Sequence, residues 1–147
     1  MRLSMALTVI GRPSRPGLRL PLFLSRVAAG FPSPAEDHIE ASLSLDELCV
    51  VHPAATFFLR VVGDSMTGLG IFDGDILVVD RSITPRAGMV VVAVVNGEFT
   101  CKQLAYEHGA PVLRAANKAY PDIRLRDGED LEVFGVVTRC IHKLPGF

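Results

Sequence analysis

The chain has 147 residues, of which 49% are hydrophobic and 21% are charged, and its formal net charge is −1. This length and apolar content predict one domain with a core of its own. The near-neutral balance lacks the polycationic signature of proteins that bind nucleic acid, so we expect no strong direct DNA binding. No run of about 18 apolar residues occurs, so we expect no membrane span.

The three cysteines, Cys49, Cys101 and Cys140, are scattered along the chain and form no Cys-x-x-Cys pair. An odd number at such spacing indicates reduced thiols in a cytoplasmic protein rather than disulfides or a zinc site. The histidines likewise lack metal-ligand spacing. We therefore expect no metal and no cofactor.

Residues 1–32 are rich in arginine and proline, and the first acidic residue of the chain is Glu36. The prolines and glycines predict a flexible, basic N-terminal arm with no core of its own. Val27-Ala28-Ala29 resembles a signal-peptidase site, but arginines interrupt the apolar stretch that a secretory signal needs. A signal peptide is therefore disfavoured.

Residues 33–147 are predicted to form a mostly β domain. Ser33-Pro34-Ala35-Glu36 and Ser44-Leu45-Asp46-Glu47 are helix-start signatures, which predict two short helical turns between about 34 and 50. From Thr56 onward, short runs of Val, Ile, Phe and Thr alternate with turn pairs, of which Asn96-Gly97 is the clearest hairpin. The predicted strands are 56–62, 75–80, 89–95, 98–104, 112–115 and 131–141. Many short strands with tight turns imply a small antiparallel, barrel-like domain.

Gly63-Asp64-Ser65-Met66 follows the predicted strand 56–62 and precedes a glycine-rich stretch, so Ser65 belongs at the mouth of a turn. A reactive serine needs such a place, because its hydroxyl must be exposed while backbone N–H groups point at an oxyanion. The alternative is an Asp-Ser turn in which both side chains cap local N–H groups.

Lys102 lies in the predicted strand 98–104, where Thr100, Lys102 and Leu104 share one face. A lysine that faces water is only a solubilising residue. A lysine that faces an apolar pocket can lose its charge and serve as the general base for a serine, and lowering its pKa from about 10.4 to about 7 corresponds to about 4.6 kcal/mol. Burial beside Met66 and Leu104, with Thr100 holding the amine, would provide that environment. This hypothesis predicts a Ser65 Oγ to Lys102 Nζ distance of about 2.6 to 3.2 Å.

Ala29-Gly30, in the arm, is a candidate bond for this serine to cut. The same pair occurs at Ala87-Gly88, but there it lies between two predicted strands whose ladder hydrogen bonds are expected to fix the backbone. The arm can extend into a cleft, and small residues let a backbone approach a nucleophile closely. The protein could therefore be its own substrate.

Four segments together resemble the LexA/UmuD family of self-cleaving serine peptidases: Gly63–Met66, Asp73–Asp80, Gly97–Lys102 and Val133–Val137. The resemblance runs from about residue 22 to residue 141. Phe31-Pro32-Ser33-Pro34-Ala35, after the Ala-Gly bond, is similar to the UmuD-like branch, whose members are accessory subunits of error-prone translesion polymerases. LexA-type repressors carry a helix-turn-helix domain before the bond, for which we expect no room in the proline-rich arm.

The resemblance implies a role for each matching residue. Ser65 would be the nucleophile, Lys102 would be the general base, and Thr100 would support the lysine amine. The backbone N–H groups of Asp64 and Ser65, beside Met66, would form the oxyanion hole. The cleaved bond would be Ala29-Gly30.

The resemblance also implies partners. They are a second copy in a homodimer, a RecA filament on single-stranded DNA that stimulates the cut during the SOS response to DNA damage, and a Y-family polymerase subunit of the UmuC type. Whether the arm is cut in its own chain or in its neighbour's stays open, as does the role of the arginine-rich first 20 residues.

Alternatives remain. One is a non-catalytic module of the same fold that recruits a polymerase. Another is a Ser-Lys peptidase that cuts other proteins, which is disfavoured because we expect no membrane anchor. GDSL-type esterases also begin with Gly-Asp-Ser, but they need a downstream Asp-x-x-His that is absent here. His142 would then have to act as the base with no clear orienting acid.

Overall fold

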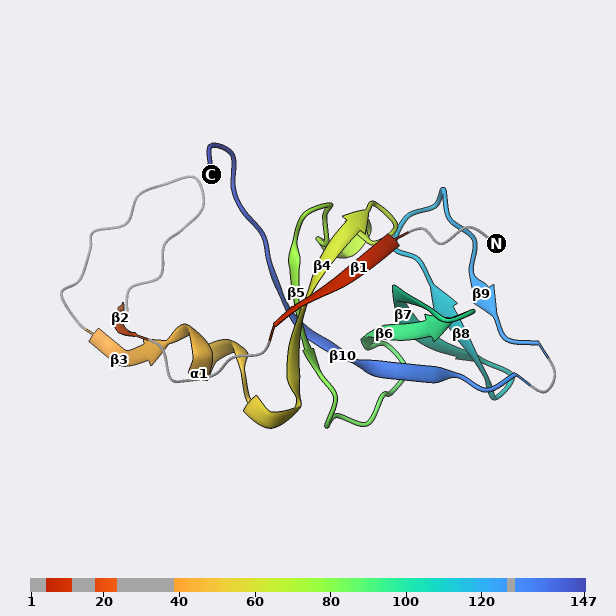
Figure 1. Ribbon diagram of the computed structural model, residues 1–147, viewed down its shortest axis with the longest axis horizontal. Helices are drawn as coiled ribbons and strands as arrows, with labels where there is room; N and C mark the ends of the chain where they lie inside the picture. The colour runs from red at the N-terminus through yellow and green to blue at the C-terminus, as the bar shows by residue number, and fades with distance from the viewer. Residues whose placement is uncertain (1–4, 12–17, 24–38, 127–128) are drawn as a thin grey trace.

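The computed structural model describes residues 5–11, 18–23, 39–126 and 129–147 (Figure 1). Its strands are β1 (Met5–Gly11), β2 (Arg19–Phe23), β3 (Ile39–Ser44), β4 (Thr56–Gly63), β5 (Ile76–Asp80), β6 (Val90–Val95), β7 (Glu98–Glu107), β8 (Ala110–Arg114), β9 (Ile123–Arg124) and β10 (Glu132–Ile141). Short helical elements are α1 (Leu45–Cys49) and the 3₁₀ turns Pro53–Ala55 and Thr67–Leu69.

The strands form an eight-stranded antiparallel sheet, in the order β1-β4-β5-β10-β6-β7-β8-β9, and a two-stranded sheet of β2 and β3. Strand β1, at one end of this order, also lies against β7, so the larger sheet curls around its core. The mostly β, antiparallel prediction is confirmed. The described strands form a strongly coiled sheet, with no pairing that closes it into a barrel.

Two apolar clusters fill the curled sheet. One contains Leu59, Leu77 and Val92, and the other contains Val91 and Leu113. Because neighbouring residues of a strand point to opposite faces, Val91 and Val92 of β6 enter different clusters. Strand β6 is therefore buried on both of its faces, which explains its continuous run of apolar residues.

The helix signature at Ser44 is confirmed, since Ser44 Oγ accepts a hydrogen bond from Glu47 N (3.1 Å) at the start of α1. The signature at Ser33–Glu36 lies outside the described residues. Residues 39–44, inside the window predicted as helical turns, form β3 instead, because they pair with β2. In the described part of the chain, no helix is long and apolar enough to cross a membrane.

Strands β1 and β2 lie within the stretch predicted as an arm. Strand β1 pairs along the outer edge of β4, with Met5 opposite Gly63 and Gly11 opposite Phe58. The β2–β3 hairpin lies at the far end of the molecule from β8 and β9 (Figure 1). Long-range pairing therefore gives regular structure to a sequence that has little local preference for it. The division of the chain into an arm of residues 1–32 and a domain of residues 33–147 stays a prediction.

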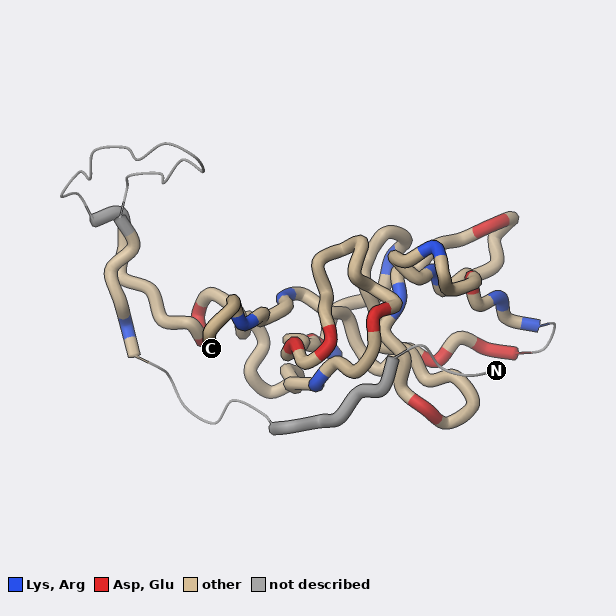
Figure 2. Tube along the Cα trace, turned by 90° about the horizontal axis from the view of Figure 1, so that it is seen from above, with Lys and Arg blue, Asp and Glu red and all other residues tan. Residues whose placement is uncertain are grey.

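Basic and acidic residues are interspersed along the described trace (Figure 2). At the end of β7, Glu107 accepts from Arg114 on β8 (2.6 Å) and from Arg124 on β9 (2.9 Å). These two guanidinium groups, that of Arg124 foremost, lower the pKa of Glu107. The network ties the three strands together at this corner of the sheet.

Gly135 follows a register shift in β10, which lies between Val133 and Gly135 in the pairing of β10 with β6. A Cβ atom at this position would lie 2.6 Å from Val79 Cγ1 and 3.2 Å from Asp80 O.

We expect Gly135→Ala to lower the free energy of unfolding by about 1 to 3 kcal/mol, because the core must shift to admit the methyl group. Urea denaturation measures this, with Glu132→Ala, an exposed site in the same strand, as the control. A Gly135→Ala protein as stable as wild type would contradict the close contact.

Candidate active site

The structure brings Ser65 and Lys102 together: Lys102 Nζ lies 3.1 Å from Ser65 Oγ. Ser65 follows β4, and the chain leaves that strand through Gly63, whose φ of 107° favours glycine. Lys102 lies in the middle of β7, opposite Val91 of β6. The measured distance is within the range predicted from the sequence.

Lys102 is almost completely buried, with 1% of its surface exposed. Its Nζ donates hydrogen bonds to Thr100 Oγ1 (3.0 Å) and to the backbone carbonyl of Cys101 (3.1 Å). Burial lowers the pKa of Lys102 to about 8, because water no longer stabilises the ammonium form. Burial also raises the pKa of the Cys101 thiol to about 12, so this neighbour stays neutral while the lysine titrates. The predicted position of Thr100 beside the amine matches the geometry.

Ser65 is fully buried, which differs from the exposed hydroxyl that we expected. Strand β1 pairs with β4 up to Gly63 and also lies against β7, so it runs along the two elements that supply Ser65 and Lys102. The loop after β8, which is hydrogen-bonded to the serine turn, also lies far from Ser65 in sequence, and the local pattern around Ser65 contains neither segment.

Met66 fixes the serine turn to the core. Its side chain is fully buried in the cluster that contains Ile71 and Cys101, and its carbonyl accepts from Leu69 N (3.1 Å) and Ile71 N (3.3 Å). The sequence predicts Met66 beside the lysine as an apolar neighbour. The structure adds that Met66 anchors the turn.

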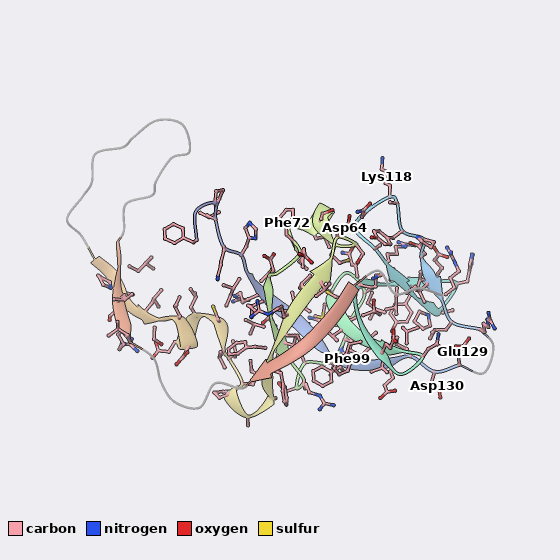
Figure 3. The ribbon with its side chains drawn as sticks, turned by 45° about the horizontal axis from the view of Figure 1, so that its top comes forward. Asp64, Phe72, Phe99, Lys118, Glu129 and Asp130 are labelled. Atoms are coloured by element: carbon pink, nitrogen blue, oxygen red, sulfur yellow. The ribbon has the colours of Figure 1, made fainter. Side chains whose placement is uncertain are left out.

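The loop after β8 contacts the serine turn through several hydrogen bonds. Ala116 N donates to Ser65 O (2.8 Å), Asn117 Nδ2 donates to Asp64 O (2.9 Å), and the Tyr120 hydroxyl donates to Asp64 Oδ1. Figure 3 shows Asp64 near the end of β4 and Lys118 at the tip of this loop, with the lysine side chain pointing outward. The sequence did not point to Ala116, Asn117 or Tyr120, because this polar loop carries no motif that marks it as part of a site.

Asp80 forms a separate Ser-His-Asp group with His52 and Ser82. His52 Nδ1 lies 2.6 Å from one carboxylate oxygen, and Ser82 Oγ donates to the other (2.6 Å). Burial works to raise the pKa of Asp80, but the hydrogen bonds from Ser82 and His52 hold it below its ordinary value. Both partners bind the carboxylate, so this group lacks the serine-to-histidine bond of a catalytic triad.

His142, the rival base considered for an esterase, does have an orienting acid. Its Nδ1 lies 2.6 Å from Asp75 Oδ1, so the expectation of no clear partner was wrong. Asp75 is buried and lies before β5, far from His142 in sequence, which is why only the fold reveals the pair. In the described part of the chain, however, the hydrogen-bond partner of Ser65 Oγ is Lys102.

The candidate bond Ala29-Gly30 lies outside the described residues, in the stretch of sequence that joins β2 to β3.

Comparison with known proteins gives consistent matches over most of the chain. Residues 21–138 match the Peptidase S24-like family. The chain is 47% identical over 123 residues to Protein SamA of Salmonella typhimurium strain LT2, covering 84% of this chain and 85% of SamA. It is 46% identical over 127 residues to Protein MucA of Escherichia coli, covering 86% of each chain. The LexA repressor of Shewanella baltica is 39% identical over 123 residues, which cover 83% of this chain and 59% of the repressor. The chain therefore belongs to the S24 peptidases, as a UmuD-like member of the LexA/UmuD family.

Proposed function

We propose that this protein is a serine peptidase that cuts its own Ala29-Gly30 bond, with Ser65 as the nucleophile and Lys102 as the general base. The observation that carries the proposal is the contact of 3.1 Å between Ser65 Oγ and the Nζ of a buried lysine. Family membership supports the reaction class, since S24 proteins are peptidases by description.

The hydrogen bonds of Lys102 suit an uncharged amine. A neutral amine has two N–H groups and one lone pair. When the N–H groups donate to Thr100 Oγ1 and the Cys101 carbonyl, the lone pair is left to accept the hydroxyl proton of Ser65. Thr100 therefore orients the base as well as holding it.

The proposed reaction uses these groups in two stages. Lys102 takes the proton of Ser65 as Oγ attacks the carbonyl carbon of Ala29, and the backbone N–H groups of Asp64 and Ser65 stabilise the resulting oxyanion. Collapse breaks the Ala29–Gly30 bond, and the Lys102 ammonium returns the proton to the nitrogen of Gly30. Water then releases residues 1–29 from Ser65, with Lys102 again as the base.

The pKa of Lys102 explains why such a protein would be slow to cut itself. With a pKa of about 8, about one molecule in ten has a neutral lysine at pH 7, and the fraction rises as the pH increases. The shift from 10.5 corresponds to about 3 kcal/mol, which is the order of magnitude that burial must supply.

The resemblance supplies the biological setting of the proposal. Residues 30–147 would form the accessory subunit of an error-prone translesion polymerase, in a cytoplasmic homodimer that binds a Y-family polymerase subunit. A RecA filament on single-stranded DNA would stimulate the cut as part of the SOS response.

We expect purified protein to lose residues 1–29 without any added enzyme at pH values above 8, where most Lys102 is neutral. Intact mass after incubation measures the cut. Ser65→Ala and Lys102→Met should stay full length, while Ser82→Ala, which alters the other serine-containing group, should cut like wild type.

Wild type that stays full length even with a RecA filament would favour the non-catalytic module. Equal shortening of Ser65→Ala would rule out Ser65 as the nucleophile. Cutting of an added protein while the arm stays intact would favour a peptidase that acts on other proteins.

Thr100→Val should separate the charge of Lys102 from its orientation. An ammonium donates a stronger hydrogen bond than an amine, so losing the acceptor at residue 100 should lower the pKa of Lys102 further. We expect the cleavage rate to reach half of its maximum at a lower pH than in wild type, with a smaller maximal rate because the amine is no longer oriented. Rate-against-pH curves measure both effects, and Thr138→Val in β10 is the control. A half-maximum that moves to higher pH would contradict the role of Thr100.

A further inference from the structure

The loop of residues 115–120, between β8 and β9, holds the serine turn at consecutive peptide groups. Asn117 Nδ2 donates to Asp64 O (2.9 Å), and Ala116 N donates to Ser65 O (2.8 Å). Gly68 N donates back to Ala116 O (2.7 Å), so the loop and the turn are joined in both directions. A Cβ on Gly68 would lie only 2.6 Å from that carbonyl oxygen, which shows how closely the two segments approach.

The bond from Asn117 determines where the N–H of Ser65 points. The described residues contain no cis peptide, and in a trans peptide the C=O and N–H groups point in opposite directions. Because Asp64 O faces Asn117, the N–H of Ser65 in the same peptide faces away from the loop. No acceptor among the described residues takes this N–H, so it is available to an oxyanion.

The Asn117 side chain is itself held at both ends. Its Oδ1 accepts from Ala119 N (2.9 Å), while its Nδ2 reaches Asp64 O. The Tyr120 hydroxyl donates to the Asp64 carboxylate, which fixes the other side of the same residue. Asp64 is therefore held at its carbonyl by Asn117 and at its carboxylate by Tyr120.

We infer that Asn117 is a positioning residue, which aims the oxyanion-binding N–H of Ser65 by holding the carbonyl of Asp64, and that Tyr120 supports it through the Asp64 side chain. The inference rests on the proposed self-cleavage and names a residue that controls it. The Asn117 side chain bonds to Asp64 O and Ala119 N, which are backbone atoms, so we expect it to change the rate without changing the titration of the base.

Asn117→Asp isolates the relevant bond. The aspartate keeps an oxygen to accept from Ala119 N but replaces the donor to Asp64 O with a second oxygen. Removing an oxyanion donor outright slows related reactions by about 10² to 10³, so misorienting one should slow self-cleavage by roughly tenfold to a hundredfold. The pH of half-maximal rate should stay that of wild type. Asn117→Ala should be slowed as well, and Lys118→Ala, at the exposed tip of the same loop, should cut like wild type.

The inference would be overturned if Asn117→Asp cut itself as fast as wild type. It would also be overturned if the variant were slower only because its pH of half-maximal rate had moved. If either variant is destabilised, rates are compared below its melting temperature, where circular dichroism shows it folded, and a wild-type rate there overturns the inference equally. Failure of the proposed function looks different, because wild type itself would then keep residues 1–29.

Strand β1 supports a second, independent inference. It covers the outer edge of β4, whose other edge pairs with β5, and it also lies against β7. Its pairing with β4 extends to Gly63, two residues before Ser65, and Ser65 and Lys102 have exposed fractions of 0% and 1%. A segment to be cut by Ser65 must reach the end of β4, which in this structure is paired with residues 5–11.

Resting again on the proposed self-cleavage, we also propose that β1 is an autoinhibitory strand, which occupies the edge of β4 leading to Ser65 and so competes with the segment carrying Ala29-Gly30 for access to the serine. The strands on either side of that segment, β2 and β3, pair with each other at the far end of the molecule (Figure 1). Cutting would therefore require β1 to leave β4 before the bond arrives.

Deleting residues 2–11 tests this role. We expect the shortened protein to cut Ala29-Gly30 at least several-fold faster than full-length protein at the same pH, by intact mass. Leu7→Pro, which removes one backbone N–H from the paired strand, should also accelerate the cut. An equal or slower rate in both variants would overturn the inhibitory role, since β1 would then be neutral or would help to present the bond.

Discussion

Burial of the Lys102 side chain is the constraint on which the rest of the site depends. An ammonium group away from water is unfavourable, and here the cost appears as a pKa lowered to about 8. Nearby polar atoms offset only part of this cost, because the Thr100 hydroxyl and the Cys101 carbonyl are neutral acceptors, which hold an ammonium more strongly than an amine but carry no opposite charge. A lysine in this state can accept a proton near neutral pH, which an exposed lysine does only rarely.

The fold creates this environment by bringing two distant parts of the sheet together. Strand β4 ends at the serine turn and β7 carries the lysine, yet β5, β10 and β6 lie between them in the order of the sheet. Curling of the sheet places β1 against both β4 and β7. Met66 and Cys101, each adjacent to one member of the pair, belong to the same apolar cluster. The core that stabilises the domain therefore also sets the distance between nucleophile and base.

Much of the fold and the pair itself could be predicted, because both leave local signals. Alternating apolar runs between turn pairs identified β4 to β8 and β10, and the capping pattern at Ser44 identified α1. The turn after β4 and the strand face shared with Thr100 pointed to Ser65 and Lys102. Strands β1 to β3 and the contacts of Asn117 could not be predicted, since they depend on partners far away in the sequence. The burial of Ser65 could not be predicted either, since the segments that contact the serine turn, such as the loop after β8, are distant in sequence.

The central claim is that a neutral Lys102 activates Ser65, and it is tested most directly by comparing two titrations of one sample. The first is the ¹³C resonance of the Lys102 side chain, assigned by its loss in Lys102→Met, and the second is the rate of self-cleavage. We predict that both have a midpoint near pH 8, with the rate rising as the lysine loses its proton. A lysine that titrates near its ordinary value of about 10.4, or a rate whose midpoint differs from that of the lysine, would contradict the claim.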